Sequence, residues 1–428
     1  MIRRVTLADL TPAERRTLVT RSAVPRADVR RAAADIVEAV RTRGDAAVED
    51  YGRRFGGLRE GGARVPADEI RKATEAASPE FVHAVRGAAA NVRKVHEAQR
   101  PDDAVVTVAP GVTIARRWAP LRRVGCYVPG GSAPLPSTLI MTAVPAQVAG
   151  VGSIAIATPA GPDGGVDPAL LATAGILGVE ELLAMGGAQA IAALAYGTES
   201  IERVDKIVGP GNAFVTAAKL AVAGDCSIDM PAGPSEALVI ADTGADPRHV
   251  AADLLAQAEH GPDSPVALVS DDPSVLDAVL DAVRELTDRL DRRDIVEKAL
   301  SDHGLAVLAA DIDEAIAFAD EYAPEHLSIH LADAAGAADR ITGAGSVFVG
   351  AWAPEPVGDY ASGANHVLPT GGLACSMSPL GTEDFGSWRQ VQTLTREGLA
   401  GLRSVVTTLA DAEGLGAHRL AVDIRFEP

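Results

Sequence analysis

The segment Val124-Gly125-Cys126-Tyr127-Val128-Pro129-Gly130-Gly131-Ser132 decides the fold of this chain. It is a short apolar run that ends in a glycine-rich turn, and after it short apolar runs alternate with amphipathic stretches. The first series of candidate strands comprises residues 125–128, 153–157, 182–185, 206–208 and 227–229. Alternation of strands and helices over this length is typical of a mostly parallel, doubly wound sheet.

A second series of apolar runs follows a break near residues 232–234. Its candidate strands are residues 237–240, 266–270, 305–309, 327–331 and 347–349, and helical stretches fill the gaps between them. The two series therefore predict two α/β domains, each built on an incomplete, Rossmann-like parallel sheet, with a cleft between them.

The regions that flank these series have other patterns. The first hundred residues are expected to be helical, with apolar residues at helical spacing from Val29 to Val40, and Pro110-Gly111 marks the turn of a hairpin. Residues 351–388 are dense in Gly, Pro, Ser and Ala, and helix is expected from about residue 390. We therefore expect four regions: a helical region with a hairpin that packs on the α/β core (1–123), two α/β domains (124–233 and 234–375) and a helical C-terminal tail (376–428).

Composition and charge exclude several classes of protein. The 428 residues are 47% hydrophobic and 23% charged, which is enough to bury a sizeable core. The formal charge is −19, from 39 basic and 58 acidic residues, so we expect the surface to repel phosphate backbones and no nucleic acid to bind. An anionic cofactor is compatible with this charge because helix N-termini and backbone N–H groups can hold phosphates.

The cysteines and the apolar segments indicate the compartment. Cys126, Cys226 and Cys375 have no CxxC spacing, which argues against a disulfide framework and against a thiolate zinc site. The N-terminus has no apolar signal-peptide core, and the most apolar window, residues 139–159, is interrupted by a proline and a glutamine. We expect a cytoplasmic protein that does not bind a membrane.

Glycine-rich loops follow three candidate strands of the first series, although a GxGxxG motif is absent. They are Pro129-Gly130-Gly131-Ser132, Gly186-Gly187-Ala188-Gln189 and Gly209-Pro210-Gly211-Asn212. Each lies between the carboxyl end of a strand and the start of a helix, where α/β sheets bind ligands. One such loop is better explained as a packing turn. Three in one domain make a ligand site an equally good interpretation.

Polar residues on a predicted helix give the first candidate for chemistry. Asp246 can cap this helix, Val250 and Leu254 form its inward stripe, and Gln257 takes the next position of the stripe, with His260 three residues later. A buried amide and imidazole need hydrogen-bond partners or a metal. The residues alone favour a hydrogen-bonded buried pair over a pair of metal ligands.

A second candidate is Pro324-Glu325-His326, at a predicted junction between a helix and a strand. A carboxylate and an imidazole at such a junction can act together in proton transfer. On composition alone, a surface loop is the slightly better interpretation.

Long stretches of sequence resemble one enzyme family. They follow one another along almost the whole chain and comprise residues 124–134, 204–216, 229–236, 257–261, 323–327, 358–370 and 413–418. Among them are Gln257-Ala258-Glu259-His260-Gly261 and Ala323-Pro324-Glu325-His326-Leu327. On these stretches the chain resembles the histidinol dehydrogenases, zinc- and NAD-dependent enzymes that complete histidine biosynthesis.

The resemblance implies one zinc ion per subunit, held by Gln257, His260, Asp359 and His418. It further implies a homodimer with shared active sites, in which the C-terminal tails are exchanged and each tail brings Glu413 and His418 to the partner's site. A ligand set without thiolate agrees with the spacing of the cysteines.

The implied reaction oxidises L-histidinol to L-histidinal and then to L-histidine, and reduces two NAD. Glu325 would activate water and His326 would move protons. Tyr127, Gln189 and Asn212 match positions that hold NAD. The positions that would contact the substrate are Ser235, Gln257, His260, His326, Asp359, His366, Glu413 and His418.

One stretch departs from the family pattern. Residues 380–388, Leu380-Gly381-Thr382-Glu383-Asp384-Phe385-Gly386-Ser387-Trp388, lack the basic pair that the family carries here, and Cys375-Ser376-Met377 lies just before them. The first alternative is therefore a relative that oxidises a different polar alcohol, such as a dihydroxypropanesulfonate, with the same zinc and NAD. Two further alternatives are a zinc hydrolase with Glu325 as its base, and a metal-dependent dimer without catalytic activity.

Overall fold

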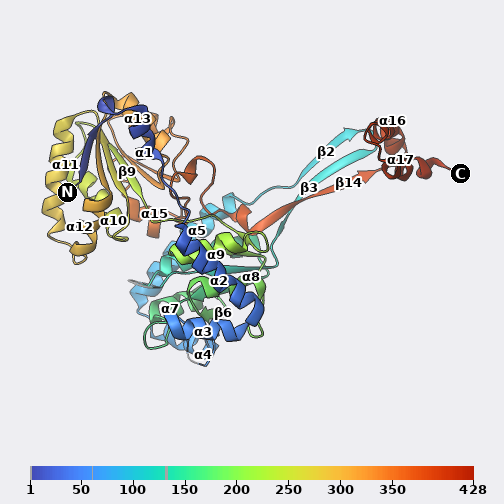
Figure 1. Cartoon of the computed structure of the whole chain (residues 1–428), viewed down its shortest axis with the longest axis horizontal. Helices are drawn as coiled ribbons and strands as arrows, with labels where there is room; N and C mark the ends of the chain where they lie inside the picture. Colours follow the sequence, from blue (N-terminus) through green and yellow to red (C-terminus); the bar gives the residue numbers. More distant parts are fainter. Residues whose placement is uncertain (1, 60, 131–133) are drawn as a thin grey trace. The chain divides into compact units, whose positions relative to one another are not determined.

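The computed structural model describes residues 2–59, 61–130 and 134–428, which form two compact units (Figure 1). The first unit consists of Met1–Gln99 and Leu121–Phe385, and the second of Arg100–Pro120 and Gly386–Pro428. Residues 131–133 of the first glycine-rich loop, Gly131, Ser132 and Ala133, lie outside the described residues.

A five-stranded parallel sheet in the first unit has the order β6-β5-β4-β7-β8. Its strands are β4 (Arg123–Tyr127), β5 (Ser153–Thr158), β6 (Glu181–Ala184), β7 (Lys206–Val208) and β8 (Ser227–Ile228). All five residues of β4 are buried, as expected for a parallel strand covered on both faces. The strands lie where the first series of apolar runs predicted them, so the parallel α/β assignment is confirmed.

Helices from two parts of the chain cover this sheet. Four come from between its strands and four from the N-terminal region: α6 (Pro136–Ala149), α7 (Pro168–Ile176), α8 (Gly187–Tyr196), α9 (Ala213–Val222), α2 (Ala27–Arg43), α3 (Asp45–Phe55), α4 (Ala67–Ala76) and α5 (Pro79–Ala98). The apolar stripe of α2, which includes Ile36, Val37 and Val40, is buried in one core with Ile191 and Val215 of α8 and α9. The N-terminal helices are therefore part of this α/β layer.

A six-stranded parallel sheet in the same unit has the order β1-β11-β10-β9-β12-β13. Its strands are β1 (Arg3–Thr6), β9 (Ala237–Ala241), β10 (Val266–Ser270), β11 (Gly304–Leu308), β12 (His326–His330) and β13 (Ser346–Val349). The helices of this layer are α1 (Pro12–Val19), α10 (Pro247–Ala258), α11 (Pro273–Thr287), α12 (Arg293–His303), α13 (Ile312–Tyr322), α14 (Ala334–Ala338) and α15 (Glu355–Tyr360). The expectation of helix throughout the first hundred residues was wrong at β1, because this polar segment pairs with β11, about three hundred residues away.

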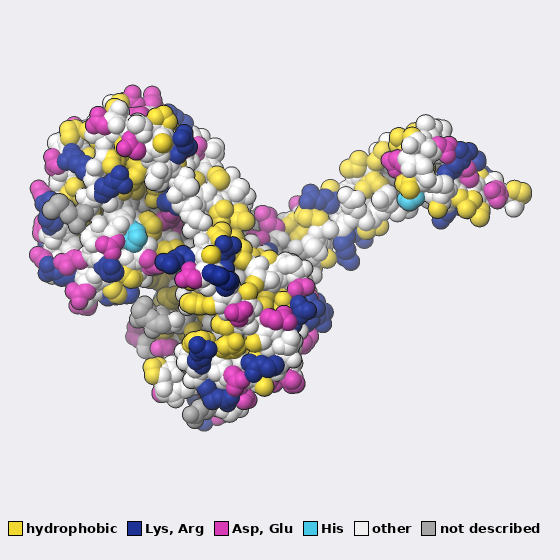
Figure 2. Space-filling view, in the orientation of Figure 1, with side chains coloured by type: hydrophobic (Ala, Val, Ile, Leu, Met, Phe, Trp, Pro, Cys, Tyr) yellow, Lys and Arg dark blue, Asp and Glu magenta, His cyan; other side chains and the backbone are white. Residues whose placement is uncertain are grey.

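The second unit is an antiparallel sheet of order β14-β3-β2 followed by helices. Its elements are β2 (Ala104–Ala109), β3 (Val112–Pro120), β14 (Gly386–Leu394), α16 (Arg396–Ala412) and α17 (Gly416–Asp423). The expected hairpin forms, but the expected helix from about residue 390 was wrong up to Leu394, because this stretch pairs with β3. Figure 2 shows hydrophobic side chains exposed along this unit. The exposed large hydrophobic residues of β2 are Val105, Val106 and Val108.

Shorter 3-10 turns cover Leu7–Asp9, Leu373–Cys375, Thr382–Phe385 and Ile424–Phe426. Within the described ranges, no helix is long and apolar enough to cross a membrane.

Candidate active site

A cleft of about 450 Å³ in the first unit collects most of the predicted catalytic and ligand residues. Loops at the carboxyl ends of β4 and β7 form part of its wall, and loops at the amino ends of β9 and β12 form another part. The predicted site residues that line it are Asn212, Ser235, His260, Glu325, His326, Asp359 and His366. The predicted catalytic pair, Glu325 and His326, thus lies at the amino end of the six-stranded sheet.

A strained turn delivers Glu325 and His326 to this cleft. Helix α13 ends at Tyr322, and the next residue, Ala323, has a φ of 50°, which makes it the one non-glycine residue with positive φ in the described part of the chain. The guanidinium of Arg21 stacks on the ring of Tyr322 at 3.4 Å and forms an ion pair with Glu236. These two contacts hold the turn in place. Backbone strain of this kind is retained where surrounding structure holds it, often at functional sites.

Helix α10 positions Gln257 and His260. Asp246 caps it by accepting a hydrogen bond from the backbone N–H of Arg248 at 2.8 Å, as its sequence predicted. Gln257 is completely buried, but His260 lies beyond the last residue of the helix and its side chain is 45% exposed. The prediction that both residues are buried was therefore wrong for His260, because the helix ends at Ala258.

Helix α15 adds a residue that the sequence reasoning missed. It begins at Glu355, which is 1% exposed, and carries Asp359 one turn later. A pair of carboxylates at i and i+4 after Pro354 was the available signal, since such spacing places both on one helix face. It was overlooked because the surrounding stretch is rich in Gly, Pro, Ser and Ala.

The side chains from these elements converge. The Nε2 atom of His260 lies 3.8 Å from Oε1 of Glu355 and 3.9 Å from Oδ2 of Asp359. Ligand atoms of these three residues all lie within 4.8 Å of one another. The Nδ1 atom of His366 is 3.0 Å from the backbone oxygen of Asp359, which ties His366 to the same cluster.

This cluster fits a metal ion. Among the described side chains, both carboxylate oxygens of Glu355 are buried without a hydrogen-bond partner. A buried carboxylate in that state is unfavourable unless a cation or a hydrogen-bond donor compensates it. Oxygen and imidazole ligands without thiolate suit zinc among other divalent ions.

Burial shifts the pKa values of the two candidate catalytic groups in opposite directions. Burial raises the pKa of Glu325 well above its usual value, and the backbone N–H of Glu236, which donates to Oε2 at 2.9 Å, offsets this only in part. Burial, assisted by the imidazoles of His260 and His366, lowers the pKa of His326 to about 3. His326 is therefore neutral near pH 7 and can accept a proton.

The same physical cause acts on the rest of the cluster. Burial raises the pKa of Asp359 to about 6 and, together with the charges of Asp359 and Glu325, raises the pKa of Glu355 well above its usual value. Burial also lowers the pKa of His366 to about 4. Without a cation the site therefore disfavours charge of either sign, so a bound cation would favour the ionised carboxylates.

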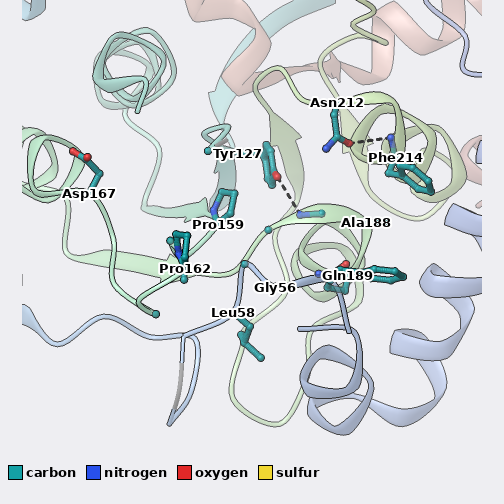
Figure 3. A pocket seen from close by; sticks show the side chains of 18 of the residues that line it. Gly56, Leu58, Tyr127, Pro159, Pro162, Asp167, Ala188, Gln189, Asn212 and Phe214 are labelled. Atoms are coloured by element: carbon teal, nitrogen blue, oxygen red, sulfur yellow. Dashed lines mark hydrogen bonds between the residues drawn. The ribbon is translucent and has the colours of Figure 1, made fainter. Parts of the chain in front are cut away.

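A larger pocket of about 1090 Å³ opens at the carboxyl end of the five-stranded sheet and is lined by all three residues predicted to hold NAD (Figure 3). The backbone N–H of Gly187 donates to the hydroxyl of Tyr127 at 3.1 Å. Asn212 caps α9, since its Oδ1 accepts from the backbone N–H groups of Phe214 and Val215. Gln189 lies on α8 and is buried. Asn212 also lines the cleft, so the two cavities adjoin.

The N-terminal region contributes to this pocket in a way that the sequence reasoning did not foresee. Ala32 and Ile36 of α2 and Gly56, Gly57 and Leu58 line it. The Gly56-Gly57 pair after α3 was the available signal, and both residues have positive φ.

Glu413 and His418 belong to the second unit. Glu413 follows α16 directly, His418 lies on α17, and both are exposed.

The stretch that departs from the family pattern lines neither cavity. It is held to the first unit by two contacts: the hydroxyl of the buried Thr382 donates to the backbone oxygen of His96 at 2.7 Å, and the half-buried Asp384 pairs with Lys206 at 3.0 Å. From Gly386 the stretch continues as β14. Its altered side chains therefore line no part of the cleft, although the backbone N–H of Leu380 donates to the backbone oxygen of Val367, a cleft-lining residue, at 2.9 Å.

Comparisons with known proteins agree along the chain. A family profile described as histidinol dehydrogenase matches residues 19–426. The chain is 48% identical to a histidinol dehydrogenase of Halobacterium salinarum over 98% of both chains. It is 46% identical to one of Vibrio parahaemolyticus over 94% of this chain and 93% of the relative. A crystal structure of histidinol dehydrogenase from Elizabethkingia anophelis is similar with a TM-score of 0.93 at 39% identity, over 99% of this chain and 98% of that one.

Proposed function

Because this chain belongs to the histidinol dehydrogenase family, we propose that its cleft oxidises L-histidinol through L-histidinal to L-histidine in two NAD-linked steps. The chain is an NAD-dependent oxidoreductase that acts on histidinol in histidine biosynthesis. The observation that carries the finer proposal is the cluster of Gln257, His260, Asp359 and the Glu325-His326 pair around one cleft.

Zinc is the ion that we assign to this cluster, with Gln257, His260 and Asp359 as ligands and His418 from a second copy of the chain as the fourth. The convergence of the His260 and Asp359 side chains and the absence of thiolate support this choice. Bound there, zinc would supply a positive charge that anchors the amine and imidazole nitrogens of the substrate and favours the ionised form of the surrounding carboxyl groups.

His326 and Glu325 divide the proton transfers. His326, as a neutral imidazole, takes the hydroxyl proton of histidinol while hydride leaves the same carbon, which forms the aldehyde. Glu325 then takes a proton from the water that adds to the aldehyde, and His326 takes a hydroxyl proton of the resulting hydrate as the second hydride leaves. Ser235 and His366 line the cleft and would contact the substrate, with Glu413 from the second copy.

The cofactor occupies the neighbouring pocket. Tyr127, Gln189 and Asn212 would hold it against the carboxyl ends of the parallel strands. Bound there, NAD would supply a hydride acceptor for each of the two oxidations. Asn212 lines both cavities, which supports transfer between them.

A homodimer with exchanged tails completes the site in this proposal. The second unit exposes Val105, Val106, Leu409 and Leu420, more apolar surface than a three-stranded sheet with two helices can cover by itself. The same unit carries Glu413 and His418. A biosynthetic role and cysteines that are all free support a cytoplasmic location.

Counting NADH tests the proposed function. With zinc-loaded protein and limiting L-histidinol, we expect two NADH for each histidinol consumed. A ratio of one would contradict the second oxidation at this site. No NADH, with zinc and NAD bound, would indicate a different alcohol, and hydrolysis without NAD would indicate a zinc hydrolase.

A further inference from the structure

Glu355 is an acidic residue of the first unit that is buried without a hydrogen-bond partner among the described residues. Its side chain is 1% exposed, and in the described chain neither carboxylate oxygen has a hydrogen-bond partner. It belongs to no motif of the sequence analysis, yet it lies at the centre of the site, 3.6 Å from the Nδ1 atom of His326. A buried carboxylate of this kind needs a compensating donor or cation, so its neighbours should reveal its role.

The imidazole nitrogen that lies nearest to the Glu355 carboxylate is Nδ1 of His326. That atom lies 3.1 Å from Oε1 of Gln257 and 3.6 Å from Oε1 of Glu355. In the proposed function, Gln257 binds zinc. It must use Oε1 for this because an amide nitrogen has no free lone pair, and a metal-bound oxygen is a weaker acceptor. The N–H at Nδ1 of His326 then has the Glu355 carboxylate as its strong acceptor.

The same two elements already contain such a pair. One turn earlier on α10, Asp253 lies 2.9 Å from Nε2 of His330, at the other end of β12. Positions 253 and 257 of the helix thus face His330 and His326 of the strand. At position 253 the acceptor is the carboxylate of Asp253. At position 257 it is the amide of Gln257, and α15 supplies the carboxylate, that of Glu355.

We infer that Glu355 is the positioning residue of His326. Its carboxylate accepts the Nδ1 proton and holds the imidazole in the tautomer whose Nε2 is bare. In that tautomer Nε2 can take the hydroxyl proton of the substrate. A separation of 3.6 Å is longer than a hydrogen bond, and catalytic hydrogen bonds often shorten when ligands bind. The inference rests on the proposed function for the roles of His326 and Gln257, whereas the short distance between Glu355 and His326 does not depend on it.

Two variants of similar size test whether Glu355 acts as a hydrogen-bond acceptor or only fills space. Glu355→Gln retains an oxygen that can accept from Nδ1, whereas Glu355→Met retains the shape without an acceptor. We expect Glu355→Met to lower kcat about 100-fold while the KM for histidinol stays within about threefold and the zinc content does not change. Glu355→Gln should lose about tenfold or less, because its carbonyl oxygen replaces the carboxylate.

A matched control and a readout without turnover complete the test. Asp253→Asn alters the equivalent buried pair outside the cleft, and kcat should stay within about threefold whatever the stability does. Nitrogen-15 NMR of histidine-labelled, zinc-loaded protein, with His326 assigned from a His326→Asn variant, should show the proton on Nδ1 in the wild type. This readout holds even if histidinol is not the substrate, so it separates failure of the inference from failure of the proposed function.

Three outcomes would overturn the inference. Loss of zinc in Glu355→Met would make Glu355 a metal ligand. Equal kcat in the Gln and Met variants would show that no acceptor is needed. A proton on Nε2 of His326 in the wild type would assign the opposite tautomer.

Discussion

Glu325 and His326 are neighbours in the sequence, yet burial raises the pKa of one and lowers the pKa of the other. Two titratable groups whose environment separates their pKa values in this way are suited to different proton-transfer roles at one pH. In the proposed function the neutral imidazole acts in both oxidations, whereas the carboxylate acts only where water is consumed. The two residues should therefore be separable by half-reaction.

Glu325→Gln should lower the rate of aldehyde oxidation about 100-fold or more and leave alcohol oxidation within about tenfold, because only the second step needs water activated. Single-turnover NADH formation from histidinol and from histidinal measures the two steps separately. Glu321→Gln, which removes an exposed carboxylate of the preceding helix, serves as the control. Equal losses in both steps would refute the division of roles.

Asp359 is a proposed zinc ligand whose burial lowers the stability of the metal-free protein near neutral pH. Burial raises its pKa from 3.8 to about 6, so its contribution to stability is present below about pH 4 and is lost as the pH rises through about 6. Asp359→Asn should therefore stabilise the metal-free protein at pH 7 by about 2 kcal/mol, a gain that should vanish near pH 4. Urea unfolding with a chelator at both pH values measures this.

In the zinc-loaded protein the sign should reverse, because Asp359→Asn removes a proposed ligand. Zinc should then raise the unfolding midpoint of the variant less than that of the wild type. A variant that is less stable than the wild type without metal at pH 7, or that gains as much from zinc, would contradict this account.

At the scale of elements, the sequence predicted the strands and helices whose patterns are local. The fully apolar runs predicted both parallel sheets, and Asp246 predicted the start of α10. The predictions that were wrong concern strands whose pairing partners are distant in the sequence. The polar segment of β1 becomes a strand only beside β11, and the exposed residues of β14 only beside β3. No local pattern specifies such pairings.

The candidate site was predictable to a similar extent. Gln257, His260 and the Glu325-His326 pair were found from spacing, although only the family resemblance gave them a role. Asp359 came from the resemblance alone, and Glu355 was missed because α15 is a short helix of six residues among glycines and prolines. The usual rule places ligands at the carboxyl ends of parallel strands, whereas the proposed catalytic residues lie at the amino end of β12, where Glu325 precedes the strand and His326 begins it.

Helix α15 depends on a glycine for its position. A Cβ on Gly358 would lie 2.7 Å from Cε1 of Phe348 on β13, and Phe348 in turn contacts the ring of His326. Gly358→Ala should push α15 outward together with Glu355 and Asp359. We expect at least tenfold weaker zinc retention and lower kcat, at a cost in stability of about 1–3 kcal/mol.

The control for this change is Gly87→Ala in α5, where a Cβ meets nothing within 4 Å. In an exposed helix that substitution should stabilise the protein by up to about 1 kcal/mol. Zinc dissociation measured with a chromogenic chelator, and thermal unfolding, report on both variants. If Gly358→Ala keeps the zinc affinity of the wild type, then the packing of α15 on Phe348 does not position the ligands.

At the scale of the whole molecule, the residues proposed for one reaction are divided between the two units. The first carries the cleft and the cofactor pocket, and the second carries Glu413 and His418 on exposed helical segments. A homodimer with exchanged tails would give each site its catalytic pair from one chain and its His418 from the other. This arrangement makes a quantitative prediction for mixed dimers.

Glu325→Gln and His418→Asn should each nearly abolish the overall conversion of histidinol to histidine in homodimers, through defects in different units. In a heterodimer of the two variants with exchanged tails, one site collects both defects and the other collects none. Tandem-tag purification of co-expressed chains should therefore recover about half of the wild-type activity per dimer. A heterodimer of Glu325→Gln with His326→Asn is the matched control and should stay inactive, because each cleft then carries a defect. If the first heterodimer is as inactive as its parents, each site is built from a single chain and the exchanged tail is wrong.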